Sequence, residues 1–236
     1  MSAANDAGQC APDLPKAALG SQSELPRWDD VLADLSVTAR QGPYFLELFA
    51  GEAGLTEAVH LQGVPVLPPV DIVRSELVTE PRDLVDVVFW HQILQLISLG
   101  LVFFLHCGTP CNTFTAARKN DGGPPPLRSS ARPLGLEGLR ASDAMLVFLG
   151  NLFLERAVEA CALVFQFGGD FLIENPLLSL LWSTPQLHLL LESTRAFALD
   201  LDQCAFGAPW LKPTRLVCST EVLDAVCVRC PGGHRH

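Results

Sequence analysis

The feature that most constrains the fold is an apolar run at 101–106, which ends abruptly at Gly108 and Pro110. A short apolar run stopped by glycine and proline is typical of a buried parallel strand. Open α/β sheets place their ligands at the carboxyl ends of such strands. Cys111 directly follows Pro110, so the sequence predicts a cysteine in a ligand-binding loop, where a nucleophile would lie.

Apolar runs and helical patterns alternate along most of the chain. We expect strands at 44–49, 64–70, 101–106, 170–173, 197–202 and 215–220, and helices at 55–62, 84–99, 142–167 and 185–193. Such alternation predicts an α/β fold with a doubly wound, mostly parallel sheet. A long irregular loop reaches to about residue 140, and loops of that length inside a compact domain are usually functional.

The 236 residues, 49% of them hydrophobic, suit one main domain with a sizeable core. We assign 1–40 to a flexible leader with one short helix at 26–40, 41–222 to the main domain, and 223–236 to a Cys/His tail. No run of 18 uncharged apolar residues occurs, so we expect no membrane span. Eight cysteines without an N-terminal signal pattern indicate a reducing, intracellular compartment, which would be the nucleus in a eukaryote.

The net charge of −10 is unexpected for a protein that binds a polyanion, so the distribution of charge matters. Residues 1–100 carry 5 basic and 14 acidic side chains, whereas 101–236 carry 11 and 12. The loop after Cys111 is locally basic and permits contact with phosphates. Its charged residues are Arg118, Lys119, Arg128, Arg132 and Arg140, opposed by Asp121 and Glu137.

A glycine-containing turn at 47–54 joins an expected strand to an expected helix. Gly51 and Gly54 would let the backbone approach a ligand, and the start of the helix offers free N–H groups. Asp71 ends the next expected strand, where a carboxylate can accept hydrogen bonds from ribose hydroxyls. Two simpler interpretations stay open, namely a plain tight turn and a helix cap at Asp71.

Three motifs occur in order along the chain: Leu-Phe-Ala-Gly-Glu-Ala-Gly at 48–54, Pro110-Cys111, and Ile-Glu-Asn-Pro at 173–176. Together they resemble the motifs of the cytosine-C5 DNA methyltransferases, in a divergent and shortened form like that of phage and mobile elements. The resemblance implies a Rossmann-like methyltransferase fold that uses S-adenosylmethionine. It places the cofactor at Phe49, Gly51, Gly54, Asp71, Asp83 and Pro110.

The motifs depart from the family pattern at one position, and one match is ambiguous. Ala53 stands where the family usually has a glycine. The match of Asp83 to the family's acidic cofactor residue is ambiguous, because three other acids lie close by in the sequence, Glu76, Glu80 and Asp86.

The resemblance also assigns the catalytic groups. C5 of cytosine is a poor nucleophile, so a thiolate must first add at C6 of the ring. Cys111 is implied as that nucleophile, and Glu174 as the acid that hydrogen-bonds or protonates N3. Taken singly, Cys111 also fits a buried structural cysteine, and Glu174 fits a cap at a strand end.

Residues 202–215 resemble the family's later basic motif, whose arginine orients the cytosine, although the usual Gln-x-Arg-x-Arg form is absent. On the basis of this resemblance, we assign Arg215 to the catalytic residues. Nucleic-acid contact is assigned to Arg118, Arg128, Arg132 and Lys212. Solvated basic ends of a strand connection are the alternative for 212–215.

The end of the chain carries Cys227, Cys230, His234 and His236, which have the softness and number of ligands for a tetrahedral zinc ion. Two free thiols are the alternative interpretation. His106 falls on an apolar stretch and is expected to be a hydrogen-bonded core histidine.

These observations predict methyl transfer from S-adenosylmethionine to C5 of cytosine in DNA. RNA is the alternative substrate, and a catalytically idle methyltransferase-like binding module is the alternative class. We see no match to the family's target-recognition region and closing helix after residue 220. We therefore expect the target sequence to be read by something small, by a protein partner or scarcely at all, with a fragment of a longer product as the alternative. The helix at 26–40 is a candidate substitute for the closing helix.

Overall fold

The computed structural model describes residues 24–235, so most of the expected flexible leader lies outside the described residues. Its centre is a five-stranded sheet with the order β1-β2-β3-β5-β4. The strands are β1 (Tyr44–Leu48), β2 (Val102–Cys107), β3 (Asp170–Pro176), β4 (Phe197–Asp202) and β5 (Pro213–Cys218). β1, β2 and β3 run parallel, whereas β5 runs antiparallel to both of its neighbours. The fold is therefore mixed α/β with a mostly parallel sheet, as the alternating pattern predicts.

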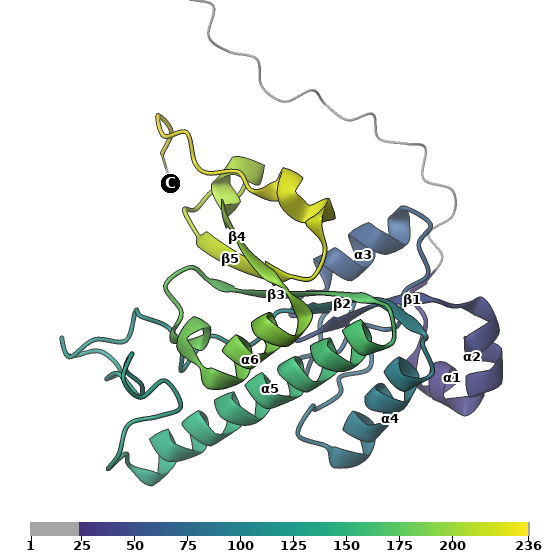
Figure 1. Ribbon diagram of the computed structural model, residues 1–236, viewed down its shortest axis with the longest axis horizontal. Helices are drawn as coiled ribbons and strands as arrows, with labels where there is room; N and C mark the ends of the chain where they lie inside the picture. Colours follow the sequence, from purple (N-terminus) through teal and green to yellow (C-terminus); the bar gives the residue numbers. More distant parts are fainter. Residues whose placement is uncertain (1–23, 236) are drawn as a thin grey trace, which may run out of the picture.

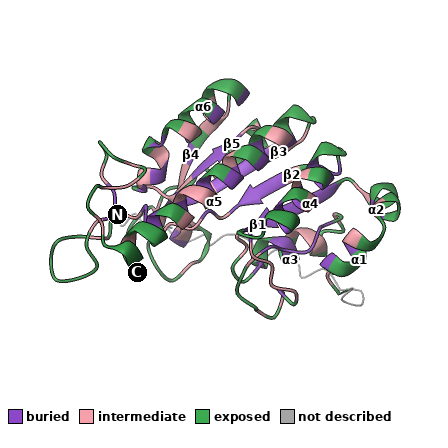
Figure 2. Ribbon diagram, turned by 90° about the horizontal axis from the view of Figure 1, so that it is seen from below, coloured by how far each residue is buried: buried purple, intermediate pink, exposed green. Residues whose placement is uncertain are grey.

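Helices cover both faces of the sheet (Figure 1). Three of them lie along one face, namely α4 (Val87–Ser98), α5 (Ala141–Gln166) and α6 (Pro185–Thr194), and α3 (Gly54–Leu61) lies on the other. Short 3-10 turns follow at η1 (Leu180–Ser183), η2 (Gln203–Phe206) and η3 (Glu221–Val226). In Figure 2 the strands are mostly buried and the outer sides of the helices are exposed, which is the amphipathic pattern that the sequence shows.

The folded core begins earlier than the expected boundary at residue 41. Two short helices, α1 (Trp28–Ala33) and α2 (Leu35–Gln41), replace the one helix expected at 26–40, and Asp34 between them caps the N-terminus of α2. Trp28 is fully buried and packs edge-on against Phe89 of α4, with ring centroids 5.1 Å apart. The N-terminal helices therefore belong to the main core.

The strand expected at 64–70 does not form a regular ladder. Two isolated parallel bridges, Phe45 with Val66 and Leu48 with Val70, are what joins it to β1. Pro65, Pro68 and Pro69 lack the backbone N–H that a ladder needs, which explains the interruption. The segment still runs beside β1 and delivers Asp71 to the same edge of the sheet as the end of β1.

A smaller apolar cluster lies on the face of the sheet opposite α5 and α6. Leu172, Leu199, Leu216 and Cys218 form it, and Leu223 and Val226 of η3 pack against it. The start of the Cys/His tail is thus folded onto β4 and β5. Across the described part of the chain, no helix is both long enough and apolar enough to cross a membrane.

Candidate active site

The carboxyl ends of the three parallel strands meet at one edge of the sheet, where α/β folds bind ligands. Phe49 follows β1, the turn from Gly108 to Cys111 follows β2, and Glu174 lies near the end of β3. This juxtaposition is what the sequence predicted from strand ends alone.

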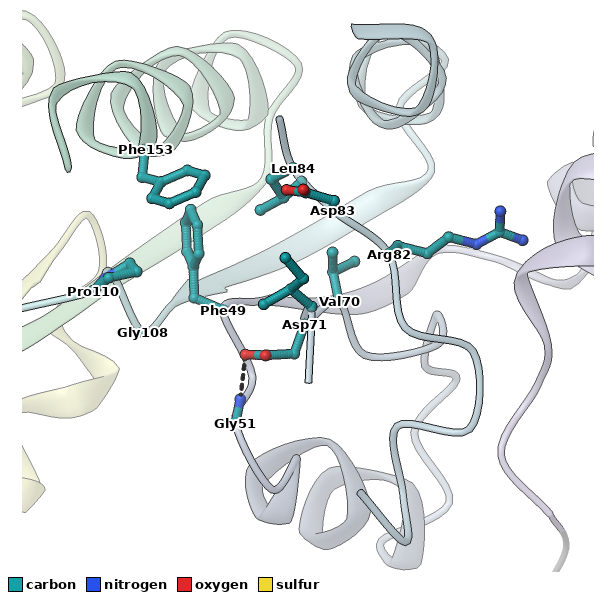
Figure 3. Close-up of a pocket in the computed structure, with 11 residues that line it drawn as sticks. Phe49, Gly51, Val70, Asp71, Arg82, Asp83, Leu84, Gly108, Pro110 and Phe153 are labelled. Atoms are coloured by element: carbon teal, nitrogen blue, oxygen red, sulfur yellow. Dashed lines mark hydrogen bonds between the residues drawn. The ribbon is translucent and has the colours of Figure 1, made fainter. Parts of the chain in front are cut away.

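A cavity of about 170 Å³, called here the Phe49 cavity, opens beside the end of β1 (Figure 3). Five of the six residues predicted to hold S-adenosylmethionine line it, namely Phe49, Gly51, Asp71, Asp83 and Pro110. The sixth, Gly54, is the first residue of α3 and does not line it. The segments that carry these residues are far apart in sequence, so the tertiary fold brings the predicted set together.

Phe49 shapes the wall of this cavity. Its backbone has a φ of 57°, a conformation that is uncommon for a bulky side chain. The ring meets Phe153 of α5 edge-on, with centroids 5.4 Å apart, and Figure 3 shows the two rings next to each other. A Cβ added at Gly108 would lie 2.8 Å from the carbonyl oxygen of Phe49, so only glycine allows the ends of β1 and β2 to approach this closely.

Asp71 is tied to the glycine turn. Its Oδ2 accepts a hydrogen bond of 2.9 Å from the Gly51 N–H, and its Oδ1 accepts one of 2.9 Å from the Val73 N–H. Each carboxylate oxygen has a second lone pair, so Asp71 keeps capacity to bind a hydroxyl. Asp71 caps no helix, because the next helix, α4, begins at Val87 with Asp86 as its N-cap.

The segment 80–83 is held from outside by the N-terminal helices. Arg82 donates to Asp29 of α1 at 2.6 Å, and Glu80 accepts from the Trp28 N–H at 2.7 Å. The Arg82 side chain accordingly points away from the cavity in Figure 3, whereas Asp83 lies at its rim. Helix α1 thus supports one wall of the Phe49 cavity but does not line the cavity. The helix that the sequence suggests as a substitute for the closing helix therefore contributes support only.

A second cavity of about 310 Å³, called here the Cys111 cavity, adjoins the first. Cys111, Glu174 and Lys212 line it, and Phe49, Gly51, Gly108 and Pro110 line both cavities. Cys111 is partly exposed, unlike the buried Cys107 at the end of β2. The predicted nucleophile and the predicted acid therefore share one cavity, next to the predicted cofactor residues.

Glu174 is surrounded by polar groups from three elements. Its Oε1 lies 3.4 Å from Lys212 Nζ and 3.4 Å from Gln203 Nε2, and its Oε2 lies 3.8 Å from His106 Nε2. Lys212, which the sequence predicts to contact nucleic acid, lies beside the Glu174 carboxylate. These partners fix the carboxylate in the cavity, which a plain strand-end cap would not require.

His106 and Glu47 were not predicted to belong to the site. His106 is hydrogen-bonded and buried, as expected of a core histidine, but it also lines the Cys111 cavity. Its Nδ1 lies 3.2 Å from Glu47 Oε1, and Glu47 Oε2 accepts hydrogen bonds from the backbone N–H and the hydroxyl of Thr56. The signal available in the sequence was a charged residue and a histidine inside two otherwise apolar strands that end at the same edge.

Two buried polar atoms of the Cys111 cavity residues have no hydrogen-bond partner among the described residues. They are Oγ1 of Thr109 and Oδ1 of Asn175. Asn175 Nδ2 donates to the Thr109 carbonyl oxygen at 2.6 Å, which fixes the orientation of the amide. Each of these two buried atoms costs free energy as long as it has no partner.

Arg215, which the sequence predicts to orient the base, lines neither cavity. Its guanidinium forms two hydrogen bonds with Asp200 of β4, Nε to Oδ1 at 2.7 Å and Nη2 to Oδ2 at 3.0 Å. The hydrogen bond from Arg215 is the main cause that lowers the pKa of Asp200. The pair joins β4 to β5 across the sheet.

Arg128, which the sequence predicts to contact phosphate, is buried. The guanidinium lies 3.6 Å above the Phe114 ring and donates to Thr113 Oγ1 at 2.9 Å and Asn151 Oδ1 at 2.6 Å. Burial lowers its pKa to about 10. A Cβ at Gly150 would lie 2.7 Å from Arg128 Nη2, so α5 needs glycine there to admit the guanidinium.

The remaining basic residues of the loop differ in exposure. Arg118 is partly buried and donates to the carbonyl oxygens of Asn112 and Pro125 at 2.9 and 3.2 Å, which folds the loop on itself. Arg132 is half-exposed and pairs with Glu137. Of the predicted phosphate-contacting arginines, Arg132 is thus the one best placed to meet a polyanion.

The tail brings together a different thiol pair from the one predicted. Cys230 and His234 lie close to Cys204 of η2, with their ligand atoms within 4.8 Å of one another. Cys227 is exposed, and its thiol lies 3.4 Å from the Asp200 carbonyl oxygen. His236, the fourth predicted ligand, lies outside the described residues.

No protein-family model matches this chain, and no curated protein matches it either.

Proposed function

We propose that this protein is a Rossmann-like methyltransferase that transfers a methyl group from S-adenosylmethionine to C5 of cytosine in DNA. One observation carries the proposal. The Phe49 cavity, lined by five residues predicted for the cofactor, shares a wall with the cavity that holds both Cys111 and Glu174. A methyl donor and its acceptor must lie side by side for direct transfer, and adjoining cavities suit that need.

The residues of the Phe49 cavity fit the proposed cofactor. Phe49 and Phe153 supply an apolar wall for a purine ring, and Asp71 supplies carboxylate acceptors for ribose hydroxyls. The turn that carries Gly51 precedes the N-terminus of α3, where backbone N–H groups favour a carboxylate. When bound, S-adenosylmethionine supplies an electrophilic methyl group.

The groups in the Cys111 cavity suit covalent catalysis on cytosine. The Cys111 sulfur would form a bond to C6 of the base and push an electron pair into the ring, where a hydrogen bond or a proton from Glu174 at N3 stabilises the added charge. After C5 has received the methyl group, loss of the C5 proton to a base and breakage of the sulfur–C6 bond restore the aromatic ring and the thiolate. In a duplex the target base must leave the stack to reach this cavity.

The direct test is transfer of labelled methyl groups from S-adenosylmethionine to DNA and, in parallel, to RNA. The expected product is 5-methylcytosine in DNA, identified by mass spectrometry of the nucleosides. Methylation of RNA alone would replace the substrate class. Binding of the cofactor without methylation of either nucleic acid would overturn the proposal in favour of an idle binding module.

A further inference from the structure

Three side chains that commonly bind zinc converge beside the outer strands of the sheet. Cys204 lies in η2, which directly follows β4, whereas Cys230 and His234 lie in the tail that follows η3. Their ligand atoms all lie within 4.8 Å of one another, and Cys230 Sγ is 3.8 Å from His234 Nε2. In a tetrahedral zinc site a cysteine sulfur and a histidine nitrogen are about 3.5 Å apart, so little movement is needed.

The backbone around Cys230 is arranged as in a preformed ligand loop. The Cys230 N–H donates to Asp202 Oδ2 at 2.8 Å, and the Gly232 N–H lies 3.4 Å from Cys230 Sγ. Gly232 and Gly233 both have positive φ angles, 75° and 79°, which turn the chain sharply after Pro231 and return His234 to Cys230. Hydrogen bonds of this kind to a sulfur orient metal ligands and stabilise the thiolate form.

Asp202 anchors the loop a second time. Its Oδ2 lies 3.2 Å from Arg229 Nε, and its backbone N–H donates to the Val228 carbonyl oxygen at 3.0 Å. Asp202 is buried at the end of β4, two residues before Cys204. The same aspartate therefore sets the position of both thiols.

We propose that Cys204, Cys230 and His234 bind one zinc ion that fastens the tail to the end of β4. Two thiolates and an imidazole select zinc over calcium or magnesium, which prefer oxygen ligands. The fourth position of a tetrahedral ion falls to water. Cys227 is not a ligand, because its thiol is exposed and lies at the Asp200 carbonyl oxygen.

Such an ion would also affect the candidate active site. Cys204 adjoins Gln203, whose side-chain amide lies 3.4 Å from Glu174 Oε1, and the Gln203 N–H donates to the Lys212 carbonyl oxygen at 3.2 Å. The zinc ion would therefore hold in place the segment that carries Gln203 and Lys212, which both contact Glu174. The proposal does not rest on methyl transfer, since its test measures metal binding alone.

The experiment uses the full chain, purified without chelators and kept reduced with a phosphine. Elemental analysis is expected to give one zinc per chain. Titration of the metal-free protein with Co²⁺ is expected to give the visible bands of a tetrahedral site and a near-ultraviolet charge-transfer band from thiolate ligands. Absence of stoichiometric zinc together with absence of the thiolate band would overturn the proposal.

Variants identify the ligands. Cys204→Ser, Cys230→Ser and His234→Ala are each expected to weaken Co²⁺ binding by at least about tenfold, because a lost ligand matters no less than a lost outer-shell partner. Cys227→Ser is the matched control, since it removes the other thiol of the Cys-x-x-Cys pair, and it is expected to bind as the parent does. His234 is exposed, so His234→Ala remains informative if a buried Cys204→Ser variant fails to fold. Loss of binding in Cys227→Ser with retention in Cys204→Ser and His234→Ala would contradict the assignment.

Discussion

His106 Nε2 lies 3.8 Å from Glu174 Oε2, so a buried histidine of β2 faces the carboxylate of the Cys111 cavity. On its other side, His106 Nδ1 lies 3.2 Å from Glu47 Oε1, and Glu47 is held by Thr56 at the start of α3. Thr56, Glu47, His106 and Glu174 thus form a continuous row of four side chains from α3 across β1 and β2 to the cavity. Because both His106 and Glu47 are buried, the row fixes the position of Glu174 from beneath.

Replacing His106 tests this row. His106→Leu leaves Glu47 Oε1 buried without its partner, and we expect the free energy of unfolding to fall by about 1–3 kcal/mol. His106→Gln retains a polar partner and is expected to lose less. Urea denaturation of the two variants provides the measurement. A leucine variant as stable as the parent would show that the contact with Glu47 contributes nothing.

The Phe49 cavity predicts cofactor binding without nucleic acid. A ligand that binds the folded state alone raises the melting temperature, so S-adenosylmethionine should stabilise the protein. Asp71→Ala removes the acceptors expected for ribose and should reduce this shift. Glu76→Ala is the matched control, because Glu76 lies exposed on the same segment and does not line the cavity. Equal shifts for Asp71→Ala and the parent would place the cofactor elsewhere.

Cys111 is expected to form a covalent bond with the base. DNA that contains 5-fluorocytosine should trap a protein–DNA adduct in the presence of cofactor, because fluorine cannot leave C5 as a proton does. Cys111→Ser nearly conserves volume and should abolish the adduct while keeping the melting temperature of the parent. Denaturing electrophoresis detects the adduct. Trapping by the serine variant would show that another residue is the nucleophile.

Arg128 and Arg132 are expected to behave differently. Arg128→Met leaves Thr113 and Asn151 without their buried donor, which should cost about 2–4 kcal/mol of stability. Arg132→Met removes a half-exposed ion pair and should change stability by less than about 0.5 kcal/mol. It should instead weaken DNA binding for all sequences and reduce the salt slope by about one contact. Unfolding curves and binding isotherms at two salt concentrations separate the two effects.

An Arg128→Met variant that is as stable as the parent would contradict this prediction. Such a result would show that the stacking of the buried guanidinium on Phe114 does not hold the loop.

The Asp200–Arg215 pair predicts a pH dependence of stability. The hydrogen bond from Arg215 lowers the pKa of Asp200 in the folded state. The stabilisation by this pair is therefore present above the unfolded pKa of about 4, and it is lost as the pH falls through the folded pKa. Both side chains are about a third exposed, so the contribution should not exceed about 1 kcal/mol. Asp200→Asn should therefore be less stable than the parent at pH 7, and the difference should shrink below about pH 4. A difference that stays constant from pH 7 to pH 3 would contradict this.

The approximate positions of most strands along the chain could be predicted from the sequence because the signals are local. The apolar run before Gly108, the helical spacing of 142–167 and the apolar run at 197–202 each lie within one element. Parallel strands bring their carboxyl ends to one edge, so placing Cys111 near Glu174 followed from the order of the elements. The strand expected at 64–70 is the exception. Its prolines lack the backbone N–H groups that pairing with β1 requires, so the ladder is interrupted.

The tertiary structure alone decided which charged and thiol groups meet. A count of charges makes Arg128 and Arg215 look alike, yet Arg128 is buried under α5 and Arg215 pairs with Asp200 of a neighbouring strand. Likewise Cys230 meets Cys204, 26 positions earlier, and not Cys227, three positions earlier. Periodicity and strand ends depend on residues that are close together in the sequence, whereas burial and the choice of partner depend on packing between segments that are distant in the chain.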